Sequence, residues 1–105
     1  MIDDLEGKVA IVTGAARGVG RALVAGFVQA GAKVVAADRD AEGLAETCAP
    51  YGDGVAAVVA DVSSVEGASE IVGTAMERFG RLDICVNNAA VAPHTELLEE
   101  RVEVW

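Results

Sequence analysis

The chain has 105 residues, enough for one domain with a single hydrophobic core but not for two. Hydrophobic residues make up 52% of it, yet the longest uninterrupted apolar run, residues 55–60, is far shorter than the roughly 20 residues of a membrane helix, so we expect no membrane segment. The formal net charge of −9, with eight basic residues that form no stripe, argues against binding to nucleic acid. The acidic N-terminal sequence does not resemble a secretory signal, and we expect a cytoplasmic protein.

Four short runs rich in Val, Ile and Ala predict β-strands, because each run is too short to form a helix by itself. They cover residues 9–12, 33–37, 55–60 and 82–86. The first and third segments between them repeat apolar residues at helical spacing, and a weaker helix is expected in the middle segment.

The predicted helices have recognisable ends. Ser63 and Glu66 match a capping box, in which the serine caps the helix and the glutamate reaches back to it. The middle helix is expected to open at Asp40 and cannot continue through Pro50. The first and third helices are expected to stop at Gly31 and Gly80.

Strands and helices thus alternate along the chain with short connections. This order predicts an α/β fold, a Rossmann-like doubly wound parallel sheet whose four strands are arranged 3-2-1-4. The near-continuous apolar strands agree with a sheet covered by helices on both faces. A crevice is expected between the first and fourth strands, where the chain reverses direction across the sheet.

Three glycines connect the first predicted strand to the first predicted helix. Gly14 ends the strand, and Gly18 and Gly20 open the helix. Glycine permits the positive φ of a tight turn and lets backbone N–H groups approach a ligand closely. Because a helix N-terminus favours anions, this turn suits the diphosphate of a dinucleotide. The alternative is a turn made only for close packing of the strand against the helix.

Asp38 strengthens the first interpretation. It ends the second predicted strand, 24 residues after Gly14, where a carboxylate can accept hydrogen bonds from the hydroxyls of an adenosine ribose. The segment that follows the fourth strand would open into the same crevice. Taken together, these features favour a dinucleotide site.

These residues resemble the short-chain dehydrogenases/reductases, whose glycine motif is TGxxxGxG. The positions matched here are Thr13, Gly14, Gly18 and Gly20. The resemblance continues with Asp61 in the sequence ADV and with NNAA at residues 87–90, close to the family's NNAG. Ala90 stands where the family has glycine and adds a Cβ near the expected cofactor. The resemblance covers essentially the whole chain, and residues 1–105 are expected to form a single dinucleotide-binding domain.

The candidate residues fall into groups around the expected cofactor. We expect the diphosphate to be surrounded by Gly14, Arg17, Gly18, Val19 and Gly20. Asp38 is expected at the ribose, with Arg39 next to it. The resemblance places Asp61 and Val62 on the adenine side, and Asn87, Ala89 and Ala90 along the remaining wall.

The choice between NAD and NADP depends on the charges near the ribose. A carboxylate at Asp38 can bind two ribose hydroxyls but would repel a 2′-phosphate, which favours NAD. Arg17 and Arg39 are the competing signal, because members of the family that use NADP can bind the phosphate with a basic residue near either position. NADP is therefore kept as the alternative.

No catalytic residue is assigned. The family uses a Tyr with a Lys four residues later, a Ser, and an Asn from a later helix, and none of these can be mapped onto this chain. Tyr51 has no such lysine and is expected to be structural, as is His94. Cys48 and Cys85 do not suggest a disulfide framework or a zinc site, and no set of metal ligands is found.

The resemblance implies an oxidoreductase that transfers hydride between NAD and a small alcohol or carbonyl compound. This chain would supply its cofactor-binding half, truncated before the catalytic half. The alternatives are a non-catalytic nucleotide-binding or regulatory module and, least favoured, a purely structural α/β domain. The fourth strand would leave a bare apolar edge that invites pairing with another chain, so a homo-oligomer is expected.

Overall fold

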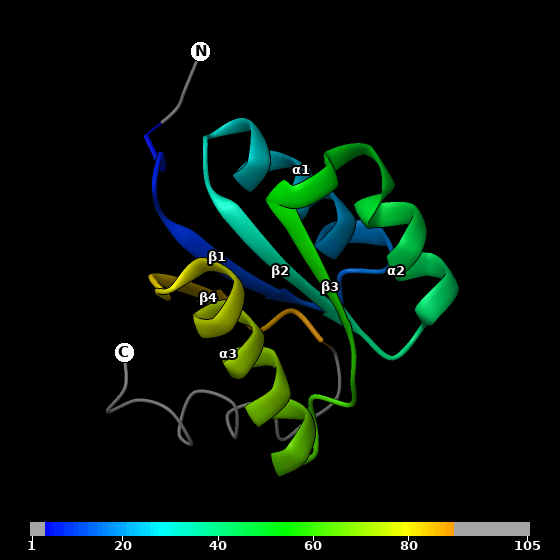
Figure 1. The fold of residues 1–105 in the computed structure, drawn as a ribbon. Coiled ribbons are helices and arrows are strands. Elements are labelled where there is room, and N and C mark those ends of the chain that lie inside the picture. Colours follow the sequence, from blue (N-terminus) through cyan, green and yellow to red (C-terminus); the bar gives the residue numbers. More distant parts are fainter. Residues whose placement is uncertain (1–3, 90–105) are drawn as a thin grey trace.

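The computed structural model describes residues 4–89. Strands and helices alternate along this part of the chain (Figure 1). The elements are β1 (Val9–Thr13), α1 (Gly18–Gln29), β2 (Lys33–Asp38), α2 (Ala41–Cys48), a 3₁₀ helix (Ala49–Gly54), β3 (Val55–Val59), α3 (Val65–Phe79) and β4 (Ile84–Val86). The strands and helices predicted for these residues are all present.

The strands form one parallel sheet in the order β3-β2-β1-β4, which confirms the predicted Rossmann-like arrangement. β1 pairs with β2 on one side and with β4 on the other. Because the strands are parallel, their carboxyl ends share one edge of the sheet. In this topology, ligands bind beyond that edge, beside the point where the strand order reverses.

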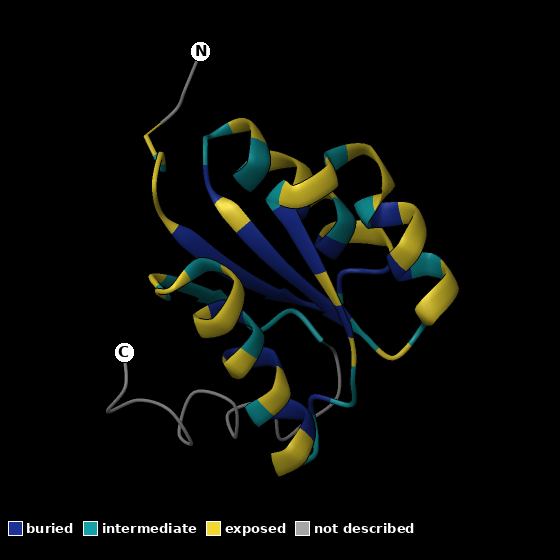
Figure 2. Cartoon of the chain, viewed as in Figure 1, coloured by how far each residue is buried: buried dark blue, intermediate teal, exposed yellow. Residues whose placement is uncertain are grey.

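Helices cover both faces of the sheet (Figure 1). Ile71 of α3 packs with Ile11 in one core cluster. Val24 of α1 and Leu44 of α2 pack with Val12 in the other cluster. Neighbouring residues of β1 therefore face opposite helical layers, and the whole strand is buried (Figure 2). This burial on both faces explains why the strand sequences are almost continuously apolar.

α3 begins one residue later than the sequence predicts. Ser64 caps it, with its hydroxyl accepting the N–H of Gly67 at 2.9 Å. Ser63 instead donates its hydroxyl to Asp61 Oδ1 at 2.6 Å, which holds Ser63 in the turn before the helix. The predicted capping box of Ser63 and Glu66 is therefore wrong, because the nearby carboxylate competes for the serine.

The other predicted helix ends agree with the structure. Asp40 caps α2 by accepting the N–H of Gly43 at 3.1 Å. α2 ends before Pro50, which lies in the first turn of the 3₁₀ helix. Gly80 ends α3 in the left-handed conformation. Among the helices of the described residues, none has the length and hydrophobicity that crossing a membrane would require.

β4 is shorter than predicted. At its start, the side chain of Asp83, rather than a backbone carbonyl, accepts a hydrogen bond from β1. The N–H of Asp83 donates to Val9 O, and the N–H of Val9 donates to Asp83 Oδ2, both at 2.9 Å. Arg81 binds the same carboxylate with Nε at 2.9 Å and Nη2 at 2.8 Å. The Arg81 side chain and then the Val9 N–H lower the pKa of Asp83. This carboxylate therefore joins β4 to β1.

We predict that Asp83→Asn lowers the free energy of unfolding at neutral pH and weakens its dependence on pH in acid. Because folding lowers the pKa of Asp83, its contribution is complete above the ordinary carboxyl value of 3.8 and is lost as the pH falls through the folded-state value. Urea unfolding at neutral pH and in steps below pH 3.8 measures both effects. The control, Asp53→Asn at an exposed position, should behave like wild type. An unchanged acid dependence in Asp83→Asn would contradict this assignment.

Candidate functional site

The turn between β1 and α1 requires its three glycines for different physical reasons. Gly14 and Gly18 have φ angles of +64° and +59°, in the left-handed region that side chains disfavour. Gly20 lies in the first turn of α1, where a Cβ would collide with the carbonyl group of Gly14. The tight turn expected from the glycine spacing is confirmed.

The N-terminus of α1 lacks the side-chain cap that α2 and α3 have. Its N-cap residue, Arg17, makes no capping hydrogen bond with its side chain, and the first turn has no acidic residue. Asp40 and Ser64 provide such caps for α2 and α3. The first N–H groups of a helix have no partner within it, and they lie at the positive end of the helix dipole. The start of α1 is therefore suited to an anion.

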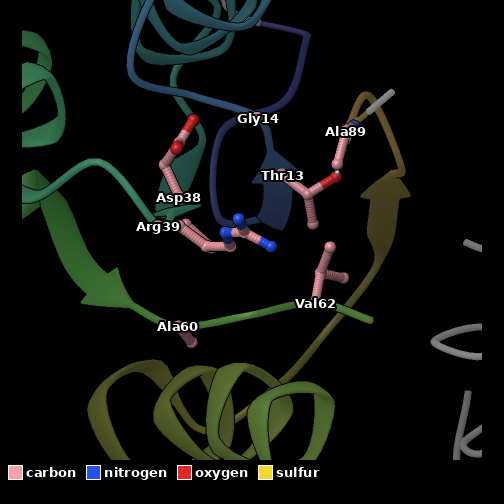
Figure 3. Close-up of a pocket in the computed structure, with 8 residues that line it drawn as sticks. Thr13, Gly14, Asp38, Arg39, Ala60, Val62 and Ala89 are labelled. Carbon is pink, nitrogen blue, oxygen red and sulfur yellow. Dashed lines mark hydrogen bonds between the residues drawn. The ribbon is translucent and has the colours of Figure 1, made fainter. Parts of the chain in front are cut away.

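Asp38 is bonded to the glycine turn. Its Oδ2 accepts the N–H of Ala16 at 3.0 Å, and its Oδ1 accepts the N–H of Asp40 at 2.9 Å. The carboxylate points toward the side of the cleft on which the turn lies and away from Ala60 (Figure 3). Because each carboxylate oxygen can accept more than one hydrogen bond, Asp38 can also bind hydroxyl groups.

The segment that follows β4 lies against the same turn. The hydroxyl of Thr13 accepts the N–H groups of Asn88 and Ala89 at 2.8 and 3.1 Å. It also donates to Asn87 Oδ1 at 3.1 Å. A Cβ at Gly14 would lie 3.1 Å from the nitrogen of Ala89. Residues 87–89 and the glycine turn therefore meet at the carboxyl ends of β4 and β1.

A cleft of about 280 Å³ opens at this edge of the sheet (Figure 3). Its volume is close to the lower limit of about 300 Å³ for small-molecule sites, so it fits one part of a dinucleotide. The wall is formed by the ends of β1 and β2 and by the segments that follow β3 and β4. The lining residues are Thr13, Gly14, Ala37, Asp38, Arg39, Ala60, Val62 and Ala89.

Arg39 extends across this cleft. In Figure 3 its side chain points toward Thr13 and Val62. Nη1 is 3.8 Å from Asp61 Oδ2, and the arginine side chain is 67% exposed. Ion pairs this exposed are weak in water, so a ligand can displace the Arg39 side chain at little cost.

The arginine and carboxylate side chains near Asp38 are arranged in pairs. Arg17 Nη2 lies 2.7 Å from Asp40 Oδ2. The N–H of Gly43 and then the side chain of Arg17 lower the pKa of Asp40. The hydroxyl and N–H of Ser63 lower the pKa of Asp61, which faces Arg39. Both carboxylates are therefore anionic at neutral pH, and Arg17 and Arg39 each face one of them.

The structure divides the predicted site residues as follows. Those that line the cleft are Gly14, Asp38, Arg39, Val62 and Ala89. Those at the start of α1 are Arg17, Gly18, Val19 and Gly20. Arg17 and Gly18 also line an adjacent hollow of about 390 Å³. Asp61 and Asn87 contact the cleft residues Arg39 and Thr13, and Ala90 lies outside the described residues.

Sequence reasoning did not assign several residues that shape the site. Thr13 matches the family's glycine motif, but sequence reasoning gives no role to its hydroxyl, which accepts the N–H groups of Asn88 and Ala89. Ala37 and Ala60 line the cleft but have no chemical group that could mark them. Arg21 and Thr47 bond to the carbonyl groups of the glycine turn, a contact that depends on how α2 packs.

A family model described as short chain dehydrogenase matches residues 8–105. Cis-2,3-dihydrobiphenyl-2,3-diol dehydrogenase of Paraburkholderia xenovorans and sorbitol dehydrogenase of Cereibacter sphaeroides are each 39% identical to this chain over 99 residues. The alignments cover 94% and 91% of this chain but only 36% and 39% of those two relatives. The chain therefore spans little more than a third of their length.

Solved structures show the same similarity. The 3-ketoacyl-(acyl-carrier-protein) reductase from Brucella melitensis, complexed with NADH, matches with a TM-score of 0.80 and 43% identity, over 84% of this chain and 36% of that one. Glucose dehydrogenase of Caenorhabditis elegans in its apo form matches with a TM-score of 0.80 and 42% identity, over 85% of this chain and 40% of that one. Sequence and fold therefore point to the same group of proteins.

We predict that Gly20→Ala destabilises the protein, whereas Gly26→Ala in the same helix stabilises it. A Cβ at residue 20 meets the backbone of Gly14 and Ala15, but nothing lies within 4 Å of a Cβ at residue 26. Overpacking costs about 1–3 kcal/mol, and replacing glycine by alanine inside a helix gains up to about 1 kcal/mol. Chemical unfolding of the two variants measures the difference. Equal stability of Gly20→Ala and wild type would show that the turn is not packed this closely against α1.

Proposed function

The chain belongs to the short-chain dehydrogenase family, and we propose that it is the dinucleotide-binding part of an oxidoreductase that transfers hydride between NAD and a small alcohol or carbonyl compound. In this proposal, residues 1–105 form a single Rossmann-type domain. The observation that carries the proposal is the uncapped start of α1, together with the bond that joins Asp38 to the same glycine turn. These two features provide acceptors and donors for a ribose and a diphosphate.

The relatives support an oxidoreductase. Both curated relatives are named as dehydrogenases, and the similar reductase from Brucella melitensis is complexed with NADH. A nicotinamide dinucleotide, when bound, accepts or supplies the hydride, and the protein binds and orients it. We assign this binding and orienting role to the residues of this chain.

We assign the diphosphate to the start of α1. The N–H groups of Gly18, Val19 and Gly20 belong to the first helical turn, where they have no partner within the helix. Gly14 lets the segment after β4 pack closely against the turn, because a Cβ there would lie 3.1 Å from the nitrogen of Ala89. Arg17 lies at the same place and is assigned to the surroundings of the diphosphate, but its side chain is paired with Asp40, so the backbone N–H groups carry most of the attraction for an anion.

We assign the adenosine to the cleft. Asp38 would accept hydrogen bonds from the ribose hydroxyls with the lone pairs that its two backbone partners leave free. The guanidinium group of Arg39 can stack on an aromatic ring, and the buried Val62 offers an apolar contact to the adenine. Asp61 would lie at the edge of the adenine. The remaining wall is assigned to Asn87, Ala89 and Ala90.

We propose NAD rather than NADP. A 2′-phosphate would be placed beside the carboxylate of Asp38, which would repel it. Arg17 and Arg39, the two cations that could bind this phosphate, face the carboxylates of Asp40 and Asp61. The carboxylate of Asp38 at the expected ribose and the pairing of both nearby arginines with carboxylates support a cofactor with a free 2′-hydroxyl.

A non-catalytic nucleotide-binding module is the second candidate. Transfer of hydride to a carbonyl group needs an acid near the substrate oxygen. Tyr51 packs against the core cluster that contains Leu44 and Val55, and it is not among the residues that line the cleft. A protein that contains this sequence and binds NADH without oxidising or reducing alcohols and carbonyl compounds would favour the module.

We predict that the chain binds NADH and that Asp38→Ala weakens binding by at least about tenfold, as expected for the loss of a hydrogen bond to a charged group. Titration followed by NADH fluorescence measures the Kd. Asp53→Ala, which removes an exposed carboxylate from the 3₁₀ helix, is the control and should bind like wild type. A folded wild-type chain that does not bind NADH would refute the proposed function.

We further predict that Asp40→Asn raises the affinity for NADPH relative to NADH by on the order of threefold, because the exposed ion pair that holds Arg17 is weak. Asparagine can still cap α2, so the variant removes the charge without removing the cap. The ratio of the two Kd values is the measurement, with Glu70→Gln on the exposed face of α3 as the control for net charge. An unchanged ratio would mean that Asp40 does not keep Arg17 from the phosphate.

A further inference from the structure

Two polar side chains hold the glycine turn against α2. Thr47 of α2 is only 3% exposed, and its hydroxyl lies 2.8 Å from Ala15 O. Arg21 of α1 donates Nε to Thr47 Oγ1 at 2.8 Å and Nη2 to Ala16 O at 2.5 Å. Consecutive carbonyl groups of the turn are therefore bonded on the side of α2.

The helix approaches the turn closely enough for these bonds because of Gly43. A Cβ at this position would lie 3.0 Å from the Cβ of Ala16. The carbonyl group of Gly43 also accepts from Arg21 Nη2 at 3.0 Å. Arg21 therefore links α1, the glycine turn and α2 through a single guanidinium group.

We propose that Thr47 and Arg21 are positioning residues for the dinucleotide site, because they fix the directions in which the N–H groups of the turn point. The inference rests on the proposed function. A peptide group is planar and trans, so its C=O and N–H bonds point in opposite directions. When the carbonyl of Ala15 faces Thr47, the N–H of the same peptide group, which belongs to Ala16, points the other way.

The structure shows the result of this orientation at Ala16. Its N–H donates to Asp38 Oδ2 at 3.0 Å, and the same carboxylate lines the cleft. The next peptide group follows the same rule. With the carbonyl of Ala16 directed at Arg21, the N–H of Arg17 points away from α2, at the position where α1 begins.

Removing the bonds would release these peptide groups. A buried carbonyl group without a partner is unfavourable, so the peptide groups of Ala15 and Ala16 would rotate toward water or another donor. Asp38 would then lose the bond that holds it against the turn. A site that must be ordered again when it binds its ligand has a lower affinity than one that is already arranged.

The test compares variants of Thr47 and Arg21 in the full chain. Thr47→Val removes the hydroxyl with little change in shape, and Thr47→Ser retains it. Arg21→Met removes the guanidinium group but keeps a long side chain. Thr74→Val is the matched control, because the Thr74 hydroxyl donates to Glu70 O at 2.8 Å within α3. Each variant is titrated with NADH at a temperature where its unfolding curve shows it to be folded.

We expect Thr47→Val and Arg21→Met to raise the Kd for NADH by at least about fivefold, as for the loss of one hydrogen bond. Thr47→Ser and Thr74→Val should stay within about twofold of wild type. Amide hydrogen exchange provides a second measurement. The amide of Ala16 should exchange faster in Thr47→Val, while that of Val35 in the core stays protected, a difference that a general loss of stability would not produce.

Wild-type NADH binding and wild-type protection of Ala16 in folded Thr47→Val would overturn the inference. If Thr47→Val does not fold, Arg21→Met decides the question by the same two measurements, because Arg21 also donates to the Thr47 hydroxyl that bonds the carbonyl of Ala15. A wild-type chain that fails to bind NADH refutes the proposed function. The exchange rate of Ala16 then decides whether these side chains orient the turn.

Discussion

The structure depends most on how the peptide groups of the turn between β1 and α1 are oriented. The carbonyl groups of Ala15 and Ala16 are bonded to Thr47 and Arg21. The N–H of Ala16 is bonded to Asp38, whereas Arg17 places no side-chain cap on the first N–H groups of α1. The peptide groups that follow Ala15 and Ala16 are therefore polarised, with their bonded carbonyls facing α2 and their N–H groups pointing the other way. Such an arrangement can bind an anion without a basic patch.

The charges around the turn explain how an acidic protein could bind a dinucleotide selectively. The net charge of −9 opposes any anion at long range, so the attraction must be local and backbone-based. The three carboxylates near the turn all have partners, since Asp38 is bonded to backbone amides and Asp40 and Asp61 face arginines. In the proposed function, a diphosphate lies at the start of the helix and a ribose lies beside Asp38. Under that proposal, an additional phosphate on the ribose would be repelled by the carboxylate of Asp38.

Much of the fold could be predicted from local sequence, because β1, β2 and β3 are buried and therefore apolar, and because glycine marks the turn at Gly14. The starts of α3 and β4 could not be predicted in this way, because they depend on which of several neighbouring polar groups form hydrogen bonds with each other. Asp61 takes Ser63 as a hydrogen-bond donor and moves the cap of α3 to Ser64, and the side chain of Asp83 replaces the first part of β4.

The site could be predicted only in part, because some of its contacts join residues that are distant in sequence. Gly14 and Asp38 have distinctive residue types at the ends of strands, so their positions follow from the order of the elements. Thr47 is a single threonine within a helix, and nothing local shows that it meets Ala15, 32 residues away in sequence. Contacts of this kind arise from the packing of α2 on the sheet. The central claim is that the free N–H groups at the start of α1 bind the diphosphate of the cofactor. It is tested most directly by the backbone amide spectrum of the chain as NADH is added. We expect the largest shifts at Gly18, Val19 and Gly20; shifts confined to α3, with these three signals unmoved, would contradict it.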